Sequence, residues 1–341
     1  IGSHIVRNNV IHDCGQNGIV GHLGCIFSEI YGNEIYSIAT KHEFYGYEIG
    51  GIKLHAAIDV QIYDNNIHHC TLGTWLDWEA QDTRVSRNLY YQNDRDLMVE
   101  VTHGPYIVDN NIFASDYNFD NVAQGGAYIN NLCCGTMRRQ DVLDRSTPYH
   151  FPHTTQMMGT SFVYGGDDRL YQNIFLGGAP IYNKEQSKYG TEDYDGCPAS
   201  YEEYISLIKE ALPGDENLYV LVKQPAYIDR NVYLNGAKAY AREEHKFVSE
   251  KDPQVKIVRE GDETFLNITV EKGVLEQCAQ VVHSESLGYN RAAEAPFDNP
   301  DGTPIAFDTD YNGVKRTDQV SAGPLENLTE GENKIKIWCK K

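Results

Sequence analysis

Short apolar segments alternate with clusters of turn-forming residues through the first two thirds of the chain. Segments such as IYDNNIHHC, TRVSRNLYYQ and YIVDNNIFA are rich in β-branched and aromatic residues, and Asn, Asp or Gly recur around them. No long 3.6-residue periodicity runs through this part of the sequence. The pattern therefore predicts many short strands separated by tight turns.

One frame recurs along these segments, an aliphatic residue followed by Asn three positions later. The spacings between successive aliphatic positions are 25, 32, 23, 22, 63 and 58 residues. The short spacings indicate a structural repeat, and the long ones indicate repeats with inserted segments. The frame occurs at Ile5/Asn8, Ile30/Asn33, Ile62/Asn65, Val85/Asn88, Ile107/Asn110, Leu170/Asn173 and Ile228/Asn231.

A repeat of this length and composition predicts an all-β fold, a right-handed parallel β-helix. Each coil places a strand on the equivalent strand of the next coil, and apolar residues fill the interior. Asn suits the repeated turn because it tolerates the left-handed conformation and its amide can bond to an identical amide one coil away. We expect Val85 and Ile107 on adjacent parallel strands, and equivalent corners at Asn8, Asn33, Asn65, Asn88 and Asn110.

The segments that interrupt the repeat define the expected domain organisation. The β-helix is predicted over residues 1–240, with insertions at about 114–168 and 176–227. The first insertion reads as a long loop. The second contains one short helix, SYEEYISLIKEAL, with Ser200 as its N-cap and Pro213-Gly214 as its stop.

Residues 241–341 are predicted to close the same domain as a β-rich cap. Residues 246–283 alternate like an antiparallel hairpin region, and a Pro/Gly/Asp-rich tail follows. The chain begins without Met and within a repeat. We therefore expect an N-terminal part of the protein to be missing from it.

Charge and cysteine content narrow the function classes. The formal net charge of −20 disfavours nucleic acid, anionic membranes and acidic polysaccharides as partners, and no run of 18 apolar residues is present to span a membrane. The eight cysteines form no CxxC pair and no zinc-finger spacing. Free thiols in a reducing compartment, hence a cytoplasmic location, are the expectation.

The repeat places two carboxylates at equivalent positions. Asp77 lies twelve residues after Asn65, and Glu100 lies twelve residues after Asn88. They are thus 23 residues apart, on adjacent coils. Strand alternation sends both outward together with Trp75, and it predicts an interior made of Leu76, Trp78, Leu97, Val99 and Val101.

Stacked parallel strands lie about 4.8 Å apart, so the two carboxyl groups are expected about 5 Å apart. A retaining glycosidase needs a separation of about 5–5.5 Å. Two carboxyl groups this close resist ionising together, so one stays protonated near neutral pH. Trp75 offers a flat face to a sugar ring. An acidic ladder on a solvated sheet is the alternative interpretation of the pair.

The segment WLDWEAQDTRVSRNLYYQNDRDLMVEVTHGPYIVDNNIFAS resembles glycoside hydrolase family 120, β-xylosidases built on a parallel β-helix. The resemblance implies that Asp77 of the WLDW strand is the nucleophile and that Glu100 of the VEV strand is the acid/base. It implies that Glu48 in YGYEIGG binds sugar hydroxyls. His55, one coil before Asp77, and His103, after the VEV strand, are further candidates for substrate binding.

The resemblance implies a retaining, exo-acting β-xylosidase for short neutral xylo-oligosaccharides, without cofactor or metal. Such proteins extend further at the N-terminal side, with more coils and a small β-sandwich. Two other functions stay open on the residues. One is a pectate-lyase-like enzyme acting on uronans, with Lys53, Arg84 and Arg95 as candidate bases; the calcium-binding Asp cluster that it needs is not evident. The other is a non-catalytic, glycan-binding β-helix. An oligomer is compatible with all three.

Overall fold

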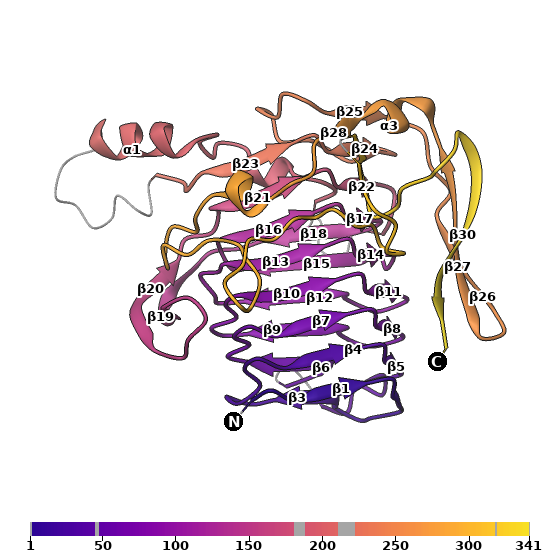
Figure 1. The fold of residues 1–341 in the computed structure, drawn as a ribbon, viewed down its shortest axis with the longest axis horizontal. Helices are drawn as coiled ribbons and strands as arrows, with labels where there is room; N and C mark the ends of the chain where they lie inside the picture. Colours follow the sequence, from indigo (N-terminus) through magenta and orange to yellow (C-terminus); the bar gives the residue numbers. More distant parts are fainter. Residues whose placement is uncertain (1, 45–47, 181–187, 211–221, 318, 341) are drawn as a thin grey trace.

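A computed structural model describes residues 2–44, 48–180, 188–210, 222–317 and 319–340. The chain forms a parallel β-helix whose coils stack from the N-terminus at the bottom of Figure 1 to α1 and β25 at its top. Three parallel sheets make up the coils, and the chain visits them in a fixed order. The predicted fold class is confirmed.

The strands of the three sheets are short, as the sequence pattern predicts. The first sheet contains β1 (Ile5–Arg7), β4 (Glu29–Tyr31), β7 (Gln61–Tyr63), β10 (Thr83–Ser86), β13 (Tyr106–Asp109), β16 (Gly126–Ile129), β21 (Asp168–Tyr171) and β23 (Ala226–Asp229). The second contains β2 (Val10–His12), β5 (Glu34–Tyr36), β8 (Asn66–His68), β11 (Leu89–Tyr91), β14 (Ile112–Phe113), β17 (Leu132–Cys133), β22 (Ile174–Leu176), β24 (Val232–Leu234) and β25 (Phe247–Ser249). The third contains β3 (Asn17–Gly21), β6 (Gly50–His55), β9 (Thr74–Asp77), β12 (Leu97–Glu100), β15 (Tyr117–Val122) and β18 (Thr136–Arg139).

A ladder of Asn side chains, all buried except the first, joins the coils between the first and second sheets. In each step the Oδ1 atom of one Asn accepts hydrogen bonds from the backbone N–H and the side-chain Nδ2 of the Asn one coil earlier, as from Asn65 to Asn88 at 3.0 and 2.9 Å. The residue before each ladder Asn has a positive φ. The ladder runs through Asn9, Asn33, Asn65, Asn88, Asn111, Asn131, Asn173 and Asn231 and ends on Glu243.

Two of the predicted frames are wrong by one residue. Val85 pairs with Val108, not with Ile107, although both strands are adjacent and parallel as predicted. Val6 likewise pairs with Ile30 in place of Ile5. Asn8 and Asn110 are therefore not ladder residues; they adopt the left-handed corner conformation (φ 55° and 53°) just before the ladder. Each of these segments contains two consecutive Asn residues, and the second one forms the hydrogen bonds of the ladder.

The predicted loop at 114–168 is also wrong in its extent. Most of this range is regular structure, because β15 completes the coil of β13 and β14, and β16, β17 and β18 form a further coil. That coil was missed because Tyr128 occupies its aliphatic position. The true insertion is an antiparallel hairpin, β19 (Val142–His150) and β20 (Met157–Val163), which hangs alongside the lower coils in Figure 1.

The predicted interior is partly confirmed. Leu76, Leu97 and Val99 are fully buried in the main core. Val101 is buried too, but it packs against residues of the β19–β20 hairpin. Trp78 was expected inside and is 43% exposed. Strand β9 ends at Asp77, so the alternation that would turn Trp78 inward no longer applies.

The upper coils carry the helices and the C-terminal cap. Helix α1 (Tyr201–Glu210) begins as predicted, because Ser200 Oγ accepts the Glu203 N–H at 3.2 Å; the predicted end at 211–214 lies outside the described residues. The smaller elements of this region are η1 (Glu192–Tyr194), α3 (Lys272–Glu276), α4 (Ser284–Leu287) and the pair β28 (Cys278–Ala279) and β29 (Val320–Ser321).

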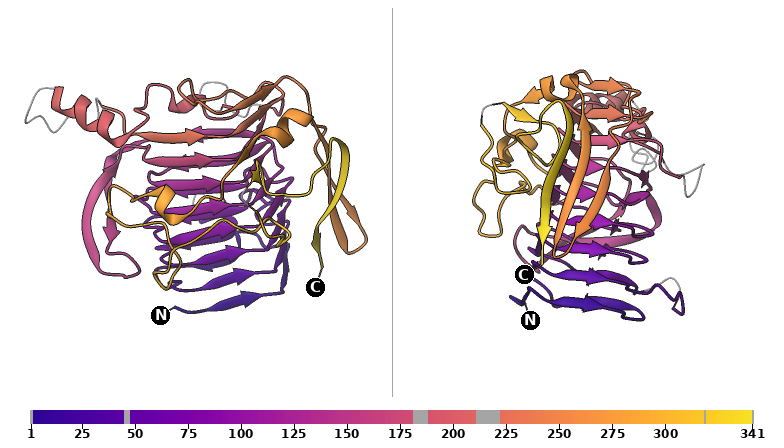
Figure 2. Two further views of the ribbon diagram at one scale, coloured as in Figure 1. Left: turned by 45° about the horizontal axis from the view of Figure 1, so that its top comes forward. Right: turned by 90° about the vertical axis from the view of Figure 1, so that its right-hand side faces the viewer.

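The predicted antiparallel hairpin is β26 (Lys256–Glu260) with β27 (Glu263–Val270), and β30 (Gly331–Cys339) adds a third strand that the sequence did not reveal. Figure 2 shows this sheet standing against one side of the β-helix. Its residues Leu266, Ile268 and Ile337 share a core with the second sheet. Parallel pairing continues to β25, so the coils extend past the predicted boundary at residue 240.

All eight cysteines are free thiols. Among the described helices, none has the length and apolar character needed to cross a bilayer.

Candidate active site

The candidate site lies on the outward face of the third sheet, where strands β6, β9 and β12 run side by side. Lys53 pairs with Trp75 and His55 pairs with Asp77 in the register between β6 and β9. Val99 pairs with Leu76 in the register between β12 and β9. Glu100 is the next residue of β12, so it lies beside Asp77 on the neighbouring strand, as the 23-residue spacing predicts.

Asp77 is held at the base of the site by a buried lysine. The Lys53 side chain has no exposed surface, and its Nζ lies 2.5 Å from Asp77 Oδ2 and 3.1 Å from Glu48 Oε2. The other carboxylate oxygen of Asp77 accepts the backbone N–H of Trp78 at 2.9 Å. These contacts compensate the charge of Asp77 and fix the orientation of its carboxylate.

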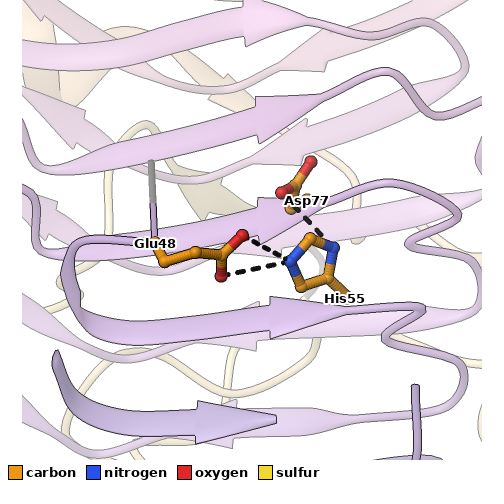
Figure 3. Close-up of side chains that lie close together, drawn as sticks. All are labelled: Glu48, His55 and Asp77. Carbon is orange, nitrogen blue, oxygen red and sulfur yellow. Dashed lines mark hydrogen bonds and ion pairs between the residues drawn. The ribbon is translucent and has the colours of Figure 1, made fainter. Parts of the chain in front are cut away.

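Glu48 and His55 complete the cluster around Asp77 (Figure 3). The Nε2 atom of His55 lies 2.9 Å from Glu48 Oε1, and its Nδ1 atom lies 3.4 Å from Asp77 Oδ2. The Glu48 side chain is 42% exposed, whereas that of Asp77 is 7% exposed. Glu48 therefore lies toward solvent, and Asp77 lies deeper. The structure brings together three of the predicted site residues.

Glu100 is held from the opposite side by the hairpin. Arg145 of β19 places Nη2 2.7 Å from Glu100 Oε1, and its guanidinium lies 5.7 Å from the ring centroid of Trp78. Burial and the neighbouring Asp77 raise the pKa of Glu100, and Arg145 opposes that rise. The site thus contains one carboxylate held by an ammonium group and one carboxyl group that favours protonation. This is the division of properties that acid catalysis beside a nucleophile requires.

Two predicted site residues lie differently than expected. Trp75 is 6% exposed, and Lys53 Nζ lies 4.0 Å from its ring centroid, so that face is not open to a sugar. His103 is 1% exposed. Its Nε2 lies 3.0 Å from the Thr147 carbonyl, and its Nδ1 lies 2.8 Å from Gln124 Nε2. His103 holds the hairpin against the β-helix, and burial lowers its pKa to about 4.

Three groups at the site were missed or undervalued from the sequence. Lys53 was considered only as a base, although alternation within GGIKLH places it on the same face as His55. Trp78 is exposed because its strand ends one residue earlier. Arg145 comes from an insertion, and no signal in the sequence links it to Glu100.

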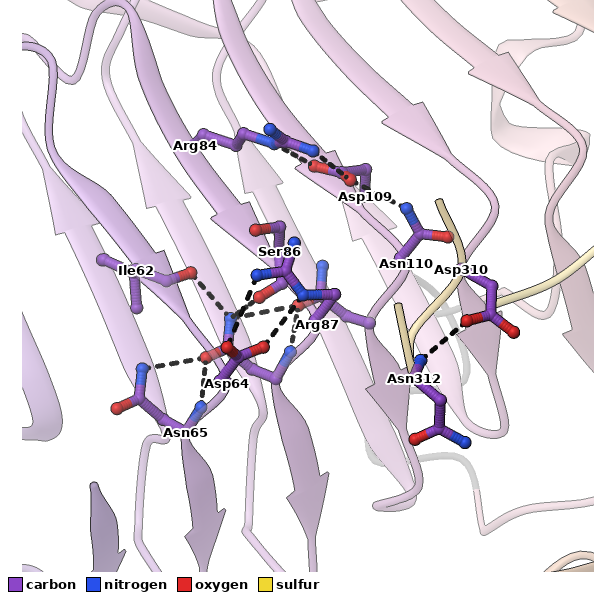
Figure 4. A network of polar contacts seen from close by, with 12 residues as sticks. Ile62, Asp64, Asn65, Arg84, Ser86, Arg87, Asp109, Asn110, Asp310 and Asn312 are labelled. Atoms are coloured by element: carbon purple, nitrogen blue, oxygen red, sulfur yellow. Dashed lines mark hydrogen bonds and ion pairs between the residues drawn. The ribbon is translucent and has the colours of Figure 1, made fainter. Parts of the chain in front are cut away.

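The arrangement also bears on the metal and lyase alternatives. Glu48, His55 and Asp77 offer ligand atoms within 4.8 Å of one another, but the Lys53 ammonium already supplies the positive charge there. The other candidate bases are also engaged. Arg84 binds both oxygens of Asp109 at 2.7 and 2.8 Å (Figure 4), and Arg95 pairs with Asp120 at 2.6 Å. A general base for a lyase is therefore not free among these three.

Comparison with models of known protein families found no match, and comparison with curated protein sequences found none either. Among solved structures, the chain is similar to one described as the complex structure of XylC with xylose. The sequence identity is 52%, the TM-score is 0.95, and the match covers 99% of this chain. Over the part of XylC that it matches, the chain is thus similar in both sequence and fold. The match covers 52% of XylC, so the chain spans about half the length of that protein. It confirms the resemblance to glycoside hydrolase family 120 that residues 75–115 carry.

Proposed function

We propose that the protein is a glycoside hydrolase that releases xylose from the ends of short, neutral xylo-oligosaccharides with retention of configuration. One observation carries the proposal. Asp77 and Glu100 lie beside each other on adjacent strands, the first held by Lys53 and the second with a raised pKa. The match to a protein solved with xylose supports the choice of sugar. Strand spacing sets an expected carboxyl separation of about 5 Å, which suits double displacement.

Asp77 is the proposed nucleophile. Its carboxylate attacks the anomeric carbon, and the bond to the leaving oxygen breaks as Glu100 donates its proton to that oxygen. Lys53 holds the Asp77 carboxylate in its orientation for the attack. In the second step Glu100, now a carboxylate, takes a proton from water, and the water oxygen displaces Asp77 from the anomeric carbon. Glu100 ends protonated, ready for the next cycle.

Glu48 and His55 are the proposed hydroxyl-binding residues. Both offer polar atoms beside Asp77 on the solvent side of the site, where the hydroxyl groups of the bound sugar would lie. His103 is not proposed to contact the substrate; it positions the hairpin that carries Arg145. Trp75 supports Lys53 from below the site in this proposal, and Trp78 is the better placed aromatic surface for a sugar ring.

Nucleophile and acid/base are distinguished by azide rescue in the full-length protein. Asp77→Ala is expected to abolish turnover of every aryl xyloside, because no covalent intermediate can form. Glu100→Ala is expected to keep the first step on a dinitrophenyl xyloside, whose leaving group needs no proton, and to accumulate the xylosyl-enzyme. Azide then restores turnover and gives β-xylosyl azide.

The control is Glu260→Ala, an exposed glutamate of the C-terminal hairpin, which should leave turnover unchanged. Rescue of Asp77→Ala by azide with inversion of the anomeric centre is the expected behaviour of a lost nucleophile and agrees with the assignment. The same inverted product from Glu100→Ala would overturn it. Full activity in both alanine variants would show that Asp77 and Glu100 are acidic residues on the sheet surface without a catalytic role.

A further inference from the structure

A second group of acidic side chains lies at a corner of the β-helix away from Asp77 and Glu100. Asp59 and Asp82 occupy equivalent positions on adjacent coils, just before β7 and β10, and both have left-handed backbone conformations (φ 54° and 53°). The tip of the β19–β20 hairpin brings His153 to this corner, and the C-terminal tail brings Asp298. Three separate segments of the chain thus meet at one point.

His153 contacts all three carboxylates. Its Nδ1 atom lies 2.7 Å from Asp59 Oδ1, and its Nε2 atom lies 3.1 Å from Asp298 Oδ1. Its backbone N–H donates to Asp82 Oδ2 at 2.9 Å. The imidazole is therefore fixed with one nitrogen toward the two corner carboxylates and the other toward the tail.

The carboxylates at this corner lack lysine and arginine partners and some hydrogen-bond partners among the described residues. The side chains of Asp59 and Asp82 are 0% and 1% exposed. Asp59 Oδ2 and Asp82 Oδ1 are buried without a hydrogen-bond partner. No described lysine or arginine forms an ion pair with either residue or with Asp298. If all three carboxyl groups are ionised, a protonated His153 offsets only one of the three negative charges. It also leaves Asp59 Oδ2 and Asp82 Oδ1 without a partner, which is costly for buried polar atoms.

We propose that Asp59, Asp82 and His153 bind a divalent cation that accepts mixed nitrogen and oxygen ligands, Mn²⁺ or Zn²⁺. Their ligand atoms lie within 4.8 Å of one another, close enough to converge on one ion. Imidazole nitrogen favours such an ion over Ca²⁺ or Mg²⁺, which prefer oxygen ligands. Neutral His153 then binds the ion through Nδ1 and donates Nε2–H to Asp298, the arrangement in which a carboxylate orients a metal-bound histidine.

The ion would fasten the hairpin tip to the β-helix. The proposed ion has a structural role and lies outside the catalytic cluster. It would act on that cluster only indirectly, because the same hairpin carries Arg145 to Glu100. No metal site is predicted from the sequence, because the proposed ligands at positions 59, 82 and 153 show no recognisable ligand spacing. The proposal does not depend on the proposed glycosidase activity, because its readouts are metal content and thermal stability.

The test uses the full-length protein purified without chelator. We expect elemental analysis to find about one Mn or Zn per chain, and EDTA to lower the Tm by several degrees. Stoichiometric Mn²⁺ or Zn²⁺ should restore the Tm, and Mg²⁺ should not. His153→Gln and Asp82→Asn should lose both the metal and the response to EDTA.

The matched control is His245→Gln, because His245 is also paired with an aspartate, Asp229, at 3.1 Å, but is exposed and pairs with no second carboxylate among the described residues. It should keep the metal. If a site variant does not fold, the test is the Tm of the EDTA-treated wild-type protein as Mn²⁺, Zn²⁺ or Mg²⁺ is added back. A wild-type protein without bound metal whose Tm responds to none of these ions overturns the proposal. Restoration by Ca²⁺ only, unaffected by His153→Gln, would overturn the assignment of the imidazole as a ligand.

Discussion

Arg145 lies with Nη2 2.7 Å from Oε1 of Glu100, although 45 residues separate them along the chain. The first prediction concerns this ion pair. Arg145 opposes the rise in the pKa of Glu100, so Arg145→Gln should raise that pKa further. The first chemical step needs protonated Glu100 and fails as pH rises through this pKa. The alkaline limb of kcat/KM against pH should therefore move to higher pH.

The displacement should be smaller than for a fully buried ion pair, because Arg145 is partly exposed and solvent screens its charge. Aryl-xyloside hydrolysis across the pH range measures it. Arg87→Gln is the control, since Arg87 pairs with Asp64 on another face of the β-helix. A limb that stays in place, or moves to lower pH, would contradict the acid role of Glu100.

Lys53→Met should damage both activity and stability. The substitution leaves the buried Asp77 carboxylate without its cation, so the carboxylate loses its ion pair and its fixed orientation. We expect kcat to fall at least about 100-fold with a smaller change in KM. Removal of one partner from a buried pair should also lower the free energy of unfolding by about 3–5 kcal/mol.

Steady-state kinetics and denaturant unfolding check this prediction. The control is Lys334→Met, which removes an ion pair whose partners, Lys334 and Glu260, are both about half exposed; it should cost less than about 1 kcal/mol. If Lys53→Met and Lys334→Met lower kcat and the free energy of unfolding equally, the prediction that the buried Lys53–Asp77 ion pair is important is wrong.

The Asn ladder should contribute stability in proportion to its burial. Asn88→Ala removes the acceptor for Asn65 and the donor to Asn111, and both partners are buried. We expect a loss of about 1–3 kcal/mol or more in the free energy of unfolding. Asn9→Ala, at the exposed first rung, should cost less because water can replace the lost bonds. Denaturant unfolding of both variants decides, and a larger loss for Asn9→Ala would contradict the ladder as a source of stability.

Trp78→Ala should weaken substrate binding more than it affects chemistry. The indole is 43% exposed beside Asp77 and Arg145, and an aromatic face is worth about 0.5–1.5 kcal/mol in contact with a flat partner. KM for xylobiose should rise about three- to tenfold with kcat nearly unchanged. Tyr201→Ala, an exposed aromatic residue of α1, serves as the control. An unchanged KM would exclude Trp78 from the sugar-binding surface.

Local periodicity determined most of the fold and the position of the proposed catalytic pair. A coil must return each strand to the same place, so a recurring Asn and a spacing of about 23 residues follow from the chain alone. Alternation within a strand then assigns the face of each side chain, which is why Asp77, Glu100 and His55 could be placed together. The errors at Asn8 and Asn110 arose where two adjacent Asn residues satisfy the same pattern.

Contacts between distant segments were decided only by the tertiary structure. Arg145 reaches Glu100, His103 is covered by the hairpin, and His153 joins Asp59 to Asp298, and in each case an insertion or the tail packs against finished coils. Such contacts depend on the shape and burial of the assembled surface, and the residues that form them do not recur at regular spacing in the sequence. The exposure of Trp78 has the same origin, because the end of a strand is set by what packs beyond it. The sequence thus determines the repeating scaffold and the face of the site, while long-range packing determines which side chains complete it.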